Sequence, residues 1–159
     1  VCKVSGDKVV PYVEEELVWA DEHKIGVAQG LDPEIVQGLR DNFQGECSEV
    51  GMYLAMSRQA FREGYPEIGV VLEQIAKEEA EHASRFQEML GDLVSSSTKE
   101  NLEKMIAGEN GACKGKLAIA KKAKALGYDA IHDSVHEMCK DEARHGKALV
   151  ALVERYLSK

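Results

Sequence analysis

The sequence predicts an all-α protein in which four long helices form a bundle built from two similar hairpins. Three observations support this fold class. Apolar residues recur at helical spacing in four segments of the 159-residue chain, and turns containing glycine or proline separate the segments. The second half of the chain repeats features of the first half at an offset of 63 positions. No convincing strand pattern occurs beyond the first 32 residues.

The elements are expected in the following order. Residues 1–32 have weak periodicity, so we expect an extended N-terminal arm with a short helix near residues 17–23. Asp32-Pro33 is typical of a helix start, because aspartate caps free backbone N–H groups and proline fits the first helical position. Residues 33–159 are therefore expected to form the helical domain. Its helices are predicted at about 33–63, at 67–90, from the capping loop 95–98 to the turn at 127–129, and at about 129–157.

The internal repeat extends to the turns and to the charged segments. Gly64-Tyr65 corresponds to Gly127-Tyr128, and the segment Lys77–His82 corresponds to Lys140–His145. The chain thus resembles two copies of one hairpin. Related helices are expected to pack around a pseudo-two-fold axis, with equivalent residues meeting at the centre.

Charge and cysteine content exclude several classes of protein. The formal net charge of −8 comes from 28 acidic and 20 basic residues, and an acidic chain argues against nucleic-acid binding. No apolar run approaches the roughly 20 residues of a membrane span, and no secretory signal is evident. The four cysteines form no C-x-x-C pair, so we expect reduced thiols in a cytoplasmic protein. The helical cysteines Cys47, Cys113 and Cys139 are interpreted as buried, inert thiols, with a position near the metal site as the alternative that their helical spacing allows.

Each predicted hairpin carries the same three candidate metal ligands. A glutamate and a histidine three positions apart share one helix face that is otherwise apolar. Burial of a carboxylate and an imidazole is unfavourable without a partner, and a metal ion supplies that partner. Another glutamate stands 33 positions before this pair in both hairpins, which places it level with the pair across two antiparallel helices. The six candidates are Glu46, Glu79, His82, Glu109, Glu142 and His145.

This set of side chains indicates a particular kind of metal centre. One glutamate from each of two helices, with Glu-x-x-His from each of the other two, is the ligand arrangement of di-iron carboxylate bundles. Hard carboxylate oxygens combined with imidazoles suit iron or manganese. The neighbouring acids Glu78 and Asp141 are candidates to hydrogen-bond the ligand histidines and fix their tautomer.

The motifs resemble those of the rubrerythrin family over about residues 33–157. Gly45-Glu46, Glu79-x-x-His82, Gly108-Glu109 and Glu142-x-x-His145 match the family's ligand motifs in order. The resemblance implies a ferritin-like bundle with two iron ions that reduces hydrogen peroxide, and in some members dioxygen. It also implies a cytoplasmic location and electrons that arrive from rubredoxin and ultimately from NADH.

The sequence departs from the family pattern at two places. Many rubrerythrins carry another carboxylate three residues after the glutamate of the third helix, where this chain has Ala112, whereas the repeat-equivalent position holds Glu49. As in the relatives called symerythrins, Glu49 is expected to be a seventh ligand, with a nearby non-ligand acid as the alternative. Tyr53, one turn later, is a candidate proton donor, although core packing explains it equally well. Residues 2–6 resemble a rubredoxin metal-binding loop with serine in place of its second cysteine, so another protein is expected to supply electrons.

The short connection between the second and third helices suggests an assembly. Level ligands in a ferritin-like bundle require this connection to span roughly 35 Å, but the linker, about residues 91–97, reaches only about 25 Å. We therefore expect a homodimer in which hairpins are swapped between two chains. The alternative functions are a ferroxidase or iron-storage protein, a manganese catalase-like enzyme, and a metal-free helical interaction module.

Overall fold

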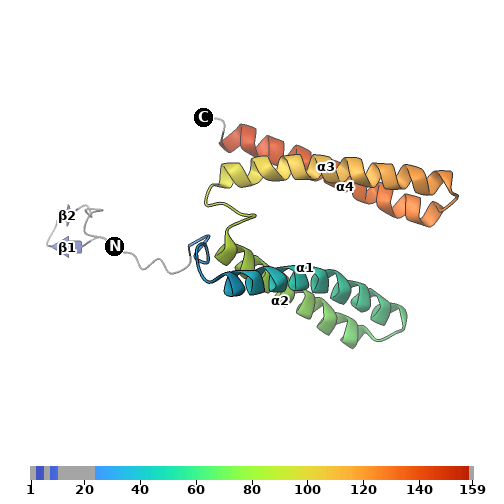
Figure 1. Cartoon of the computed structure of the whole chain (residues 1–159), viewed down its shortest axis with the longest axis horizontal. Helices are drawn as coiled ribbons and strands as arrows, with labels where there is room; N and C mark the ends of the chain where they lie inside the picture. Colours follow the sequence, from blue (N-terminus) through green and yellow to red (C-terminus); the bar gives the residue numbers. More distant parts are fainter. Residues whose placement is uncertain (1–2, 6–7, 11–23, 158–159) are drawn as a thin grey trace. The chain divides into compact units, whose positions relative to one another are not determined.

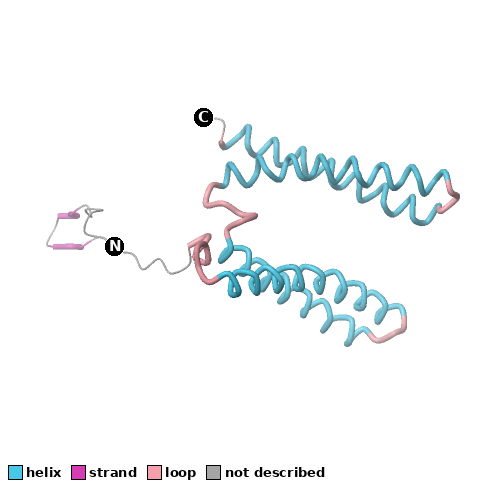
Figure 2. The backbone as a smooth tube through the Cα atoms, in the orientation of Figure 1, coloured by secondary structure: helices cyan, strands magenta, loops and turns pink. Residues whose placement is uncertain are grey.

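A computed structural model of the chain describes residues 3–5, 8–10 and 24–157 (Figure 1). The described residues form four long helices, which confirms the all-α, ferritin-like fold class predicted from the sequence. Two compact units, residues 1–90 and 91–159, each contain one antiparallel helical hairpin (Figure 2). The helices are α1 (Pro33–Arg62), α2 (Pro66–Leu90), α3 (Thr98–Ala125) and α4 (Asp129–Tyr156).

The N-terminal arm contains two short paired strands that the sequence did not predict. Strand β1 (Lys3–Ser5) pairs antiparallel with strand β2 (Lys8–Val10), with Lys3 opposite Val10. The helix expected near residues 17–23, together with Cys2 and Gly6 of the rubredoxin-like loop, lies outside the described residues.

The last part of the arm caps the C-terminal end of α2. The backbone N–H of Gly26 donates to the carbonyl oxygen of Glu88 at 2.8 Å, and that of Ala28 donates to Met89 at 2.9 Å. The final carbonyl groups of a helix have no partner within the helix, so these bonds satisfy groups that would otherwise need water. Ala28 is only 3% exposed, so this segment packs as part of the first unit.

Helix α1 begins as the sequence predicted. The side chain of Asp32 accepts hydrogen bonds from the backbone N–H groups of Glu34 at 2.9 Å and Ile35 at 3.3 Å. Pro33 follows at the first helical position, where its missing N–H is not needed.

The sequence repeat reappears in the two hairpin turns. Gly64 and Gly127 have φ values of 84° and 76°, a left-handed conformation that glycine adopts without strain. In the first turn the N–H of Tyr65 donates to the carbonyl of Ala60 at 2.9 Å, and the equivalent bond joins Tyr128 to Ala123 at 2.9 Å. The first helix of each hairpin therefore ends in the same way, at the same Gly-Tyr pair of the repeat.

Small side chains allow the two helices of each hairpin to approach closely. In the first unit, the fully buried Ser57 Oγ donates to the carbonyl of Gly69 at 2.8 Å. A Cβ atom at Gly69 would lie 2.7 Å from the ring of Phe61, so this contact requires glycine unless the ring moves. At the equivalent level of the second unit, His132 Nδ1 lies 2.9 Å from the carbonyl oxygen of Ala120.

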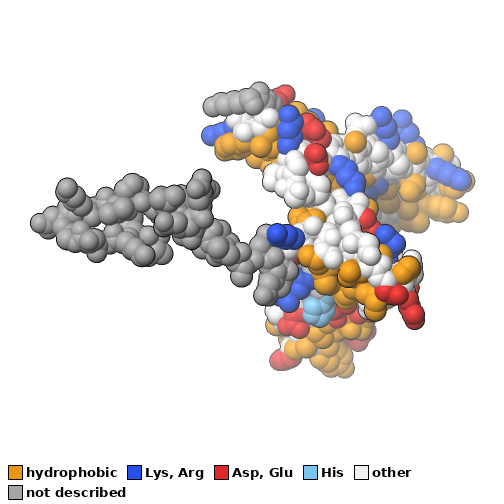
Figure 3. All heavy atoms as spheres, turned by 60° about the vertical axis from the view of Figure 1, so that its left-hand side comes forward, with side chains coloured by type: hydrophobic (Ala, Val, Ile, Leu, Met, Phe, Trp, Pro, Cys, Tyr) orange, Lys and Arg blue, Asp and Glu red, His pale blue; other side chains and the backbone are white. Residues whose placement is uncertain are grey.

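Each hairpin leaves apolar side chains that it does not cover by itself. Hydrophobic side chains are visible on the surface in Figure 3. A pair of helices has too little interior to bury them all, so their exposure indicates that each hairpin needs a further packing partner. Examples that are at least half exposed are Met52, Val71, Met105, Ile119, Ile131 and Met138. Among the described residues, no helix has the length and hydrophobicity needed to cross a lipid bilayer.

Candidate metal centre

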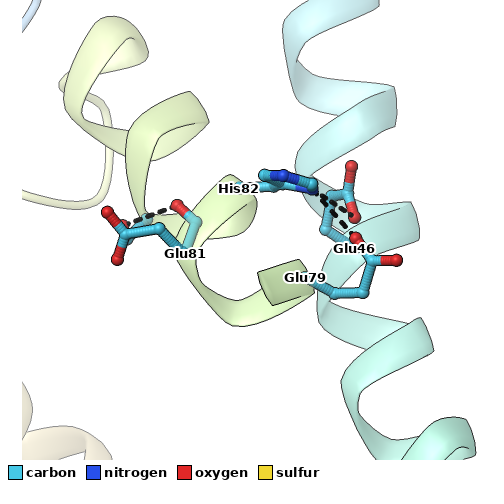
Figure 4. A network of polar contacts seen from close by, with 5 residues as sticks. Glu46, Glu79, Glu81 and His82 are labelled. Atoms are coloured by element: carbon cyan, nitrogen blue, oxygen red, sulfur yellow. Dashed lines mark hydrogen bonds and ion pairs between the residues drawn. The ribbon is translucent and has the colours of Figure 1, made fainter. Parts of the chain in front are cut away.

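The first hairpin brings three predicted ligands together. Glu46 lies on α1, and Glu79 and His82 lie one turn apart on α2, so their side chains converge between the two helices (Figure 4). One ligand atom from each residue lies within 4.8 Å of the others. His82 Nδ1 is 2.9 Å from Glu79 Oε2 and 3.8 Å from Glu46 Oε2. Glu81 points away from this cluster, on the other side of α2 (Figure 4).

The second hairpin repeats the cluster with Glu109 on α3 and with Glu142 and His145 on α4. Their ligand atoms again lie within 4.8 Å of one another, and His145 Nδ1 is 3.7 Å from Glu109 Oε2. The side chains of Glu109 and Glu142 are 15% and 19% exposed, respectively, whereas that of His145 is 48% exposed. Each hairpin alone therefore shields its carboxylates and leaves its imidazole accessible.

The paired carboxylates repel each other when no cation is present. The pKa of Glu46 is raised, first because its protonated form can hydrogen-bond to Glu79, and also because of burial and the negative charge of Glu79. The pKa of Glu109 is raised in the same way by Glu142 and by burial. A cation removes this repulsion, so both pairs favour metal binding over two ionised carboxylates alone.

The donor set fits iron or manganese. Each cluster offers carboxylate oxygens and one imidazole nitrogen, which are ligands that iron and manganese accept. Glu109 Oε2 is buried and, within the described residues, makes no hydrogen bond. An ionised oxygen in that position is costly unless a cation or a proton neutralises it. Sequence reasoning identified all six residues, and the structure groups them into two sets of three.

Glu49 and Tyr53 lie close to the first cluster but are not among its three members. Glu49 is half-buried on α1 and lines a cavity of about 240 Å³ together with Glu46. Its negative charge adds a small contribution to the raised pKa of Glu46, after that of Glu79. Tyr53 is half-buried one helical turn later. The assignment of Glu49 as a ligand and of Tyr53 as a proton donor stays a prediction.

Two of the sequence interpretations differ from the structure of the single hairpins. Glu78 accepts a hydrogen bond from Gln74, and Asp141 pairs with Arg144, so within its own hairpin neither acid bonds to the ligand histidine. Cys47 was expected to be buried but is exposed on α1. In both cases the residue lies next to an inward-facing ligand, and a shift of one position turns a helical side chain by about 100°.

Sequence reasoning also missed a cation beside the second cluster. Lys116 Nζ lies 2.9 Å from Glu142 Oε1, and this contact contributes, after that of Glu109, to the lowered pKa of Glu142. The equivalent position of the first hairpin is Tyr53. The signal that was available is the spacing of Lys116 two helical turns after Glu109, on the same face of α3.

The comparisons with known proteins agree with this geometry. Residues 38–99 match the Rubrerythrin family. The chain is 60% identical to reverse rubrerythrin-1 of Clostridium acetobutylicum over 156 residues, which cover 98% of this chain and 86% of that protein. The chain belongs to the rubrerythrin family. This rubrerythrin is also 53% identical to an uncharacterised protein of Methanocaldococcus jannaschii over 141 residues, covering 89% of this chain and 98% of that protein. It is 32% identical to a rubrerythrin of Porphyromonas gingivalis over 123 residues, covering 70% of this chain and 62% of that protein.

Family membership and geometry together give a limited functional statement. Rubrerythrins are ferritin-like di-iron proteins, so the family indicates an oxidoreductase. Within its described residues, this rubrerythrin carries two candidate metal-binding clusters of two carboxylates and one histidine.

Proposed function

We propose that this rubrerythrin is a non-haem di-iron peroxidase that reduces hydrogen peroxide to water. The observation that carries the proposal is the repeated cluster of two glutamates and one histidine, with ligand atoms within 4.8 Å of one another in both hairpins. One such cluster offers too few ligands for two iron ions, whereas the two together provide four carboxylates and two imidazoles. We propose that both clusters contribute to one centre.

The side chains of this chain have distinct roles in the proposal. Iron held by the six ligands would supply Lewis acidity and one-electron reducing equivalents for cleavage of the O–O bond. Glu46 and Glu109 hold protons more tightly than ordinary glutamates, so they release protons when they bind the metal. Glu49, beside Glu46, is placed to serve as a further carboxylate ligand. The Tyr53 hydroxyl is proposed to donate a proton or a hydrogen bond to the reacting oxygen.

The electron donor and the location complete the proposal. Peroxide reduction consumes two electrons, and we propose that a separate rubredoxin-like protein supplies them in the cytoplasm. Dioxygen is the alternative oxidant at the same centre. Exposed His82 and His145 give each cluster an open side in its own hairpin, which supports the proposal that a second cluster completes the centre.

We further propose that a second copy of the chain completes the bundle. Glu79 stands eleven positions before the end of α2, and Glu109 stands eleven positions after the start of α3. Parallel helices with level ligands would need a connection of roughly 33 Å, whereas the seven residues 91–97 extend over about 25 Å. A swapped dimer removes this difficulty and covers the apolar side chains that each hairpin leaves exposed. Sedimentation of the iron-loaded protein as a monomer would refute this assembly.

Kinetics of the reduced protein test the peroxidase proposal. Anaerobically reduced, iron-loaded protein is mixed with peroxide or with dioxygen in a stopped-flow instrument, and the oxidation of iron is followed. We expect faster oxidation by peroxide and sustained turnover only when a rubredoxin-like donor is present. Faster oxidation by dioxygen with iron accumulating in a cage would favour a ferroxidase, and oxygen release without any donor would favour a catalase.

Two substitutions on α2 provide a matched pair. Glu79→Gln removes a ligand and is expected to lower peroxide turnover by at least about 100-fold. Glu81→Gln changes an exposed residue that pairs with Arg85 on the other side of the helix, so turnover is expected to stay within about twofold of the unmodified protein. Equal activity of the two variants would contradict the proposed centre. Tyr53→Phe with unchanged turnover would remove Tyr53 from the mechanism.

A further inference from the structure

Two cysteine thiols meet between the helices of the second hairpin. Cys113 Sγ on α3 lies 3.4 Å from Cys139 Sγ on α4. The thiol of Cys139 also donates to the backbone carbonyl oxygen of Cys113 at 3.2 Å, so the two helices are in close contact at this level. Cys139 is 6% exposed and Cys113 is half-buried, whereas Cys47 is exposed on α1.

Packing alone does not require sulfur at these positions. The internal repeat assigns Val50 and Ala76 to the equivalent places in the first hairpin. Ala76 is 2% exposed and Val50 is half-buried, so apolar side chains without sulfur occupy the equivalent positions of α1 and α2. The second hairpin therefore carries a dithiol where its counterpart carries hydrocarbon.

The dithiol is next to the second metal-binding cluster and is open on one side. Cys113 follows Glu109 by one helical turn, and Cys139 precedes Glu142 by about one turn. Cys113 and Glu142 line one cavity of about 330 Å³. An oxidant small enough to reach Glu142 can therefore also reach Cys113, while the more deeply buried Cys139 is reached through Cys113.

We propose that Cys113 and Cys139 form a redox-active dithiol that hydrogen peroxide converts into a disulfide between α3 and α4. The sulfur of Cys113 attacks one peroxide oxygen, the O–O bond breaks, and a sulfenic acid and one water are formed. The sulfur of Cys139 then attacks the sulfur of Cys113, the S–O bond breaks, and a second water leaves as the S–S bond forms. The thiols lose two electrons and two protons, and peroxide gains them.

The geometry favours this closure. The two sulfur atoms must approach from 3.4 Å to about 2.05 Å, a movement that small changes in the side-chain torsions of both cysteines can supply. The inference takes its oxidant from the proposed function, because peroxide is the substrate assigned to the neighbouring centre. It adds a second electron source, which would deliver two electrons inside the protein itself.

Thiol mapping of the full-length chain tests the proposal. The protein is prepared anaerobically with reduced thiols, treated with one equivalent of peroxide, alkylated, digested and analysed by mass spectrometry. We expect the loss of two titratable thiols per chain and a peptide that links Cys113 to Cys139. Cys113→Val and Cys139→Ala, which introduce the residues of the first hairpin, should each abolish the linked peptide. Cys47→Ser should leave its yield unchanged.

The other outcomes overturn the proposal. Two thiols that remain open to alkylation after peroxide has been consumed would exclude the dithiol, as would irreversible oxidation of Cys113 with Cys139 still free. Turnover of peroxide with an external donor is measured separately in the Cys113→Val/Cys139→Ala double variant. If the disulfide forms in the unmodified protein but peroxide is not turned over in an iron-dependent reaction, the dithiol is supported and the peroxidase proposal is rejected. If peroxide is turned over while both thiols stay reduced, the peroxidase proposal is supported and the dithiol is rejected.

Discussion

Lys116 allows a quantitative test of how the second cluster binds its metal. Its ammonium group lies 2.9 Å from Glu142 Oε1, which is one of the carboxylates proposed to bind the metal. A metal must compete with this ion pair. Lys116→Met keeps the length and the apolar stem of the side chain but removes the charge. We therefore expect Lys116→Met to bind the metal more tightly.

The size of the effect follows from the exposure of the pair. The Lys116 side chain is 32% exposed and that of Glu142 is 19% exposed, so water partly screens their attraction. Partly exposed ion pairs of this kind change a binding equilibrium by roughly two- to fivefold. The higher metal affinity of Lys116→Met should be present at neutral pH, where Glu142 is ionised with or without Lys116. It should shrink towards about pH 5, because the loss of Lys116 raises the pKa of Glu142 and protons then compete with the metal.

The assay is an anaerobic titration with ferrous iron in competition with a chromophoric chelator at two pH values. Lys114→Met is the matched control, because it removes the same charge from an exposed position of the same helix. Net charge alone would shift both variants equally. An unchanged or weaker affinity in Lys116→Met at neutral pH would refute the competition argument and would indicate that Lys116 orients Glu142 for the metal.

Two further predictions concern the first hairpin without metal. The pKa of Glu46 is raised in the folded state, so the stability contributed by its bound proton is present below the ordinary value of 4.5 and is lost as the pH rises through the raised pKa. In urea unfolding from about pH 4 to about pH 7, unmodified protein should therefore lose stability relative to Glu46→Gln, and a constant difference would contradict this assignment. Ser57→Ala should lower the free energy of unfolding by about 1 kcal/mol, because the buried hydroxyl loses its bond to the carbonyl of Gly69. Ser134 is exposed, so Ser134→Ala should lower the free energy of unfolding clearly less in the same thermal or urea measurement. Equal losses in the two variants would show that the buried bond of Ser57 is not the cause.

Local patterns were sufficient to predict the helices and the six candidate ligands. The Asp32-Pro33 start was readable because the capping bonds join Asp32 to residues two and three positions later. The pairing of Glu79 with His82 was readable because residues three apart on a helix share a face. The repeat at 63 positions then identified the second hairpin without any knowledge of tertiary contacts.

Contacts across a hairpin that no repeated motif marks could not be derived in this way. The bond from Lys116 to Glu142 and the contact between Cys113 and Cys139 depend on how far α4 is rotated and shifted along α3. Periodicity gives the apolar face of a helix only to within a broad stripe, and a small rotation exchanges an inward-facing residue for its neighbour. The misplacement of Glu78 has the same origin, because it precedes Glu79 by one position and turns outward.

The sequence by itself thus determined that this rubrerythrin has four helices in two repeated hairpins, with a carboxylate and histidine set in each. These features arise from interactions between residues close together in the chain. Only the tertiary structure decided that a lysine pairs with one carboxylate of the second cluster and that a dithiol lies beside this cluster. Those features depend on the packing angle and register between two helices, which are set by the fit of many side chains at once and not by any local motif.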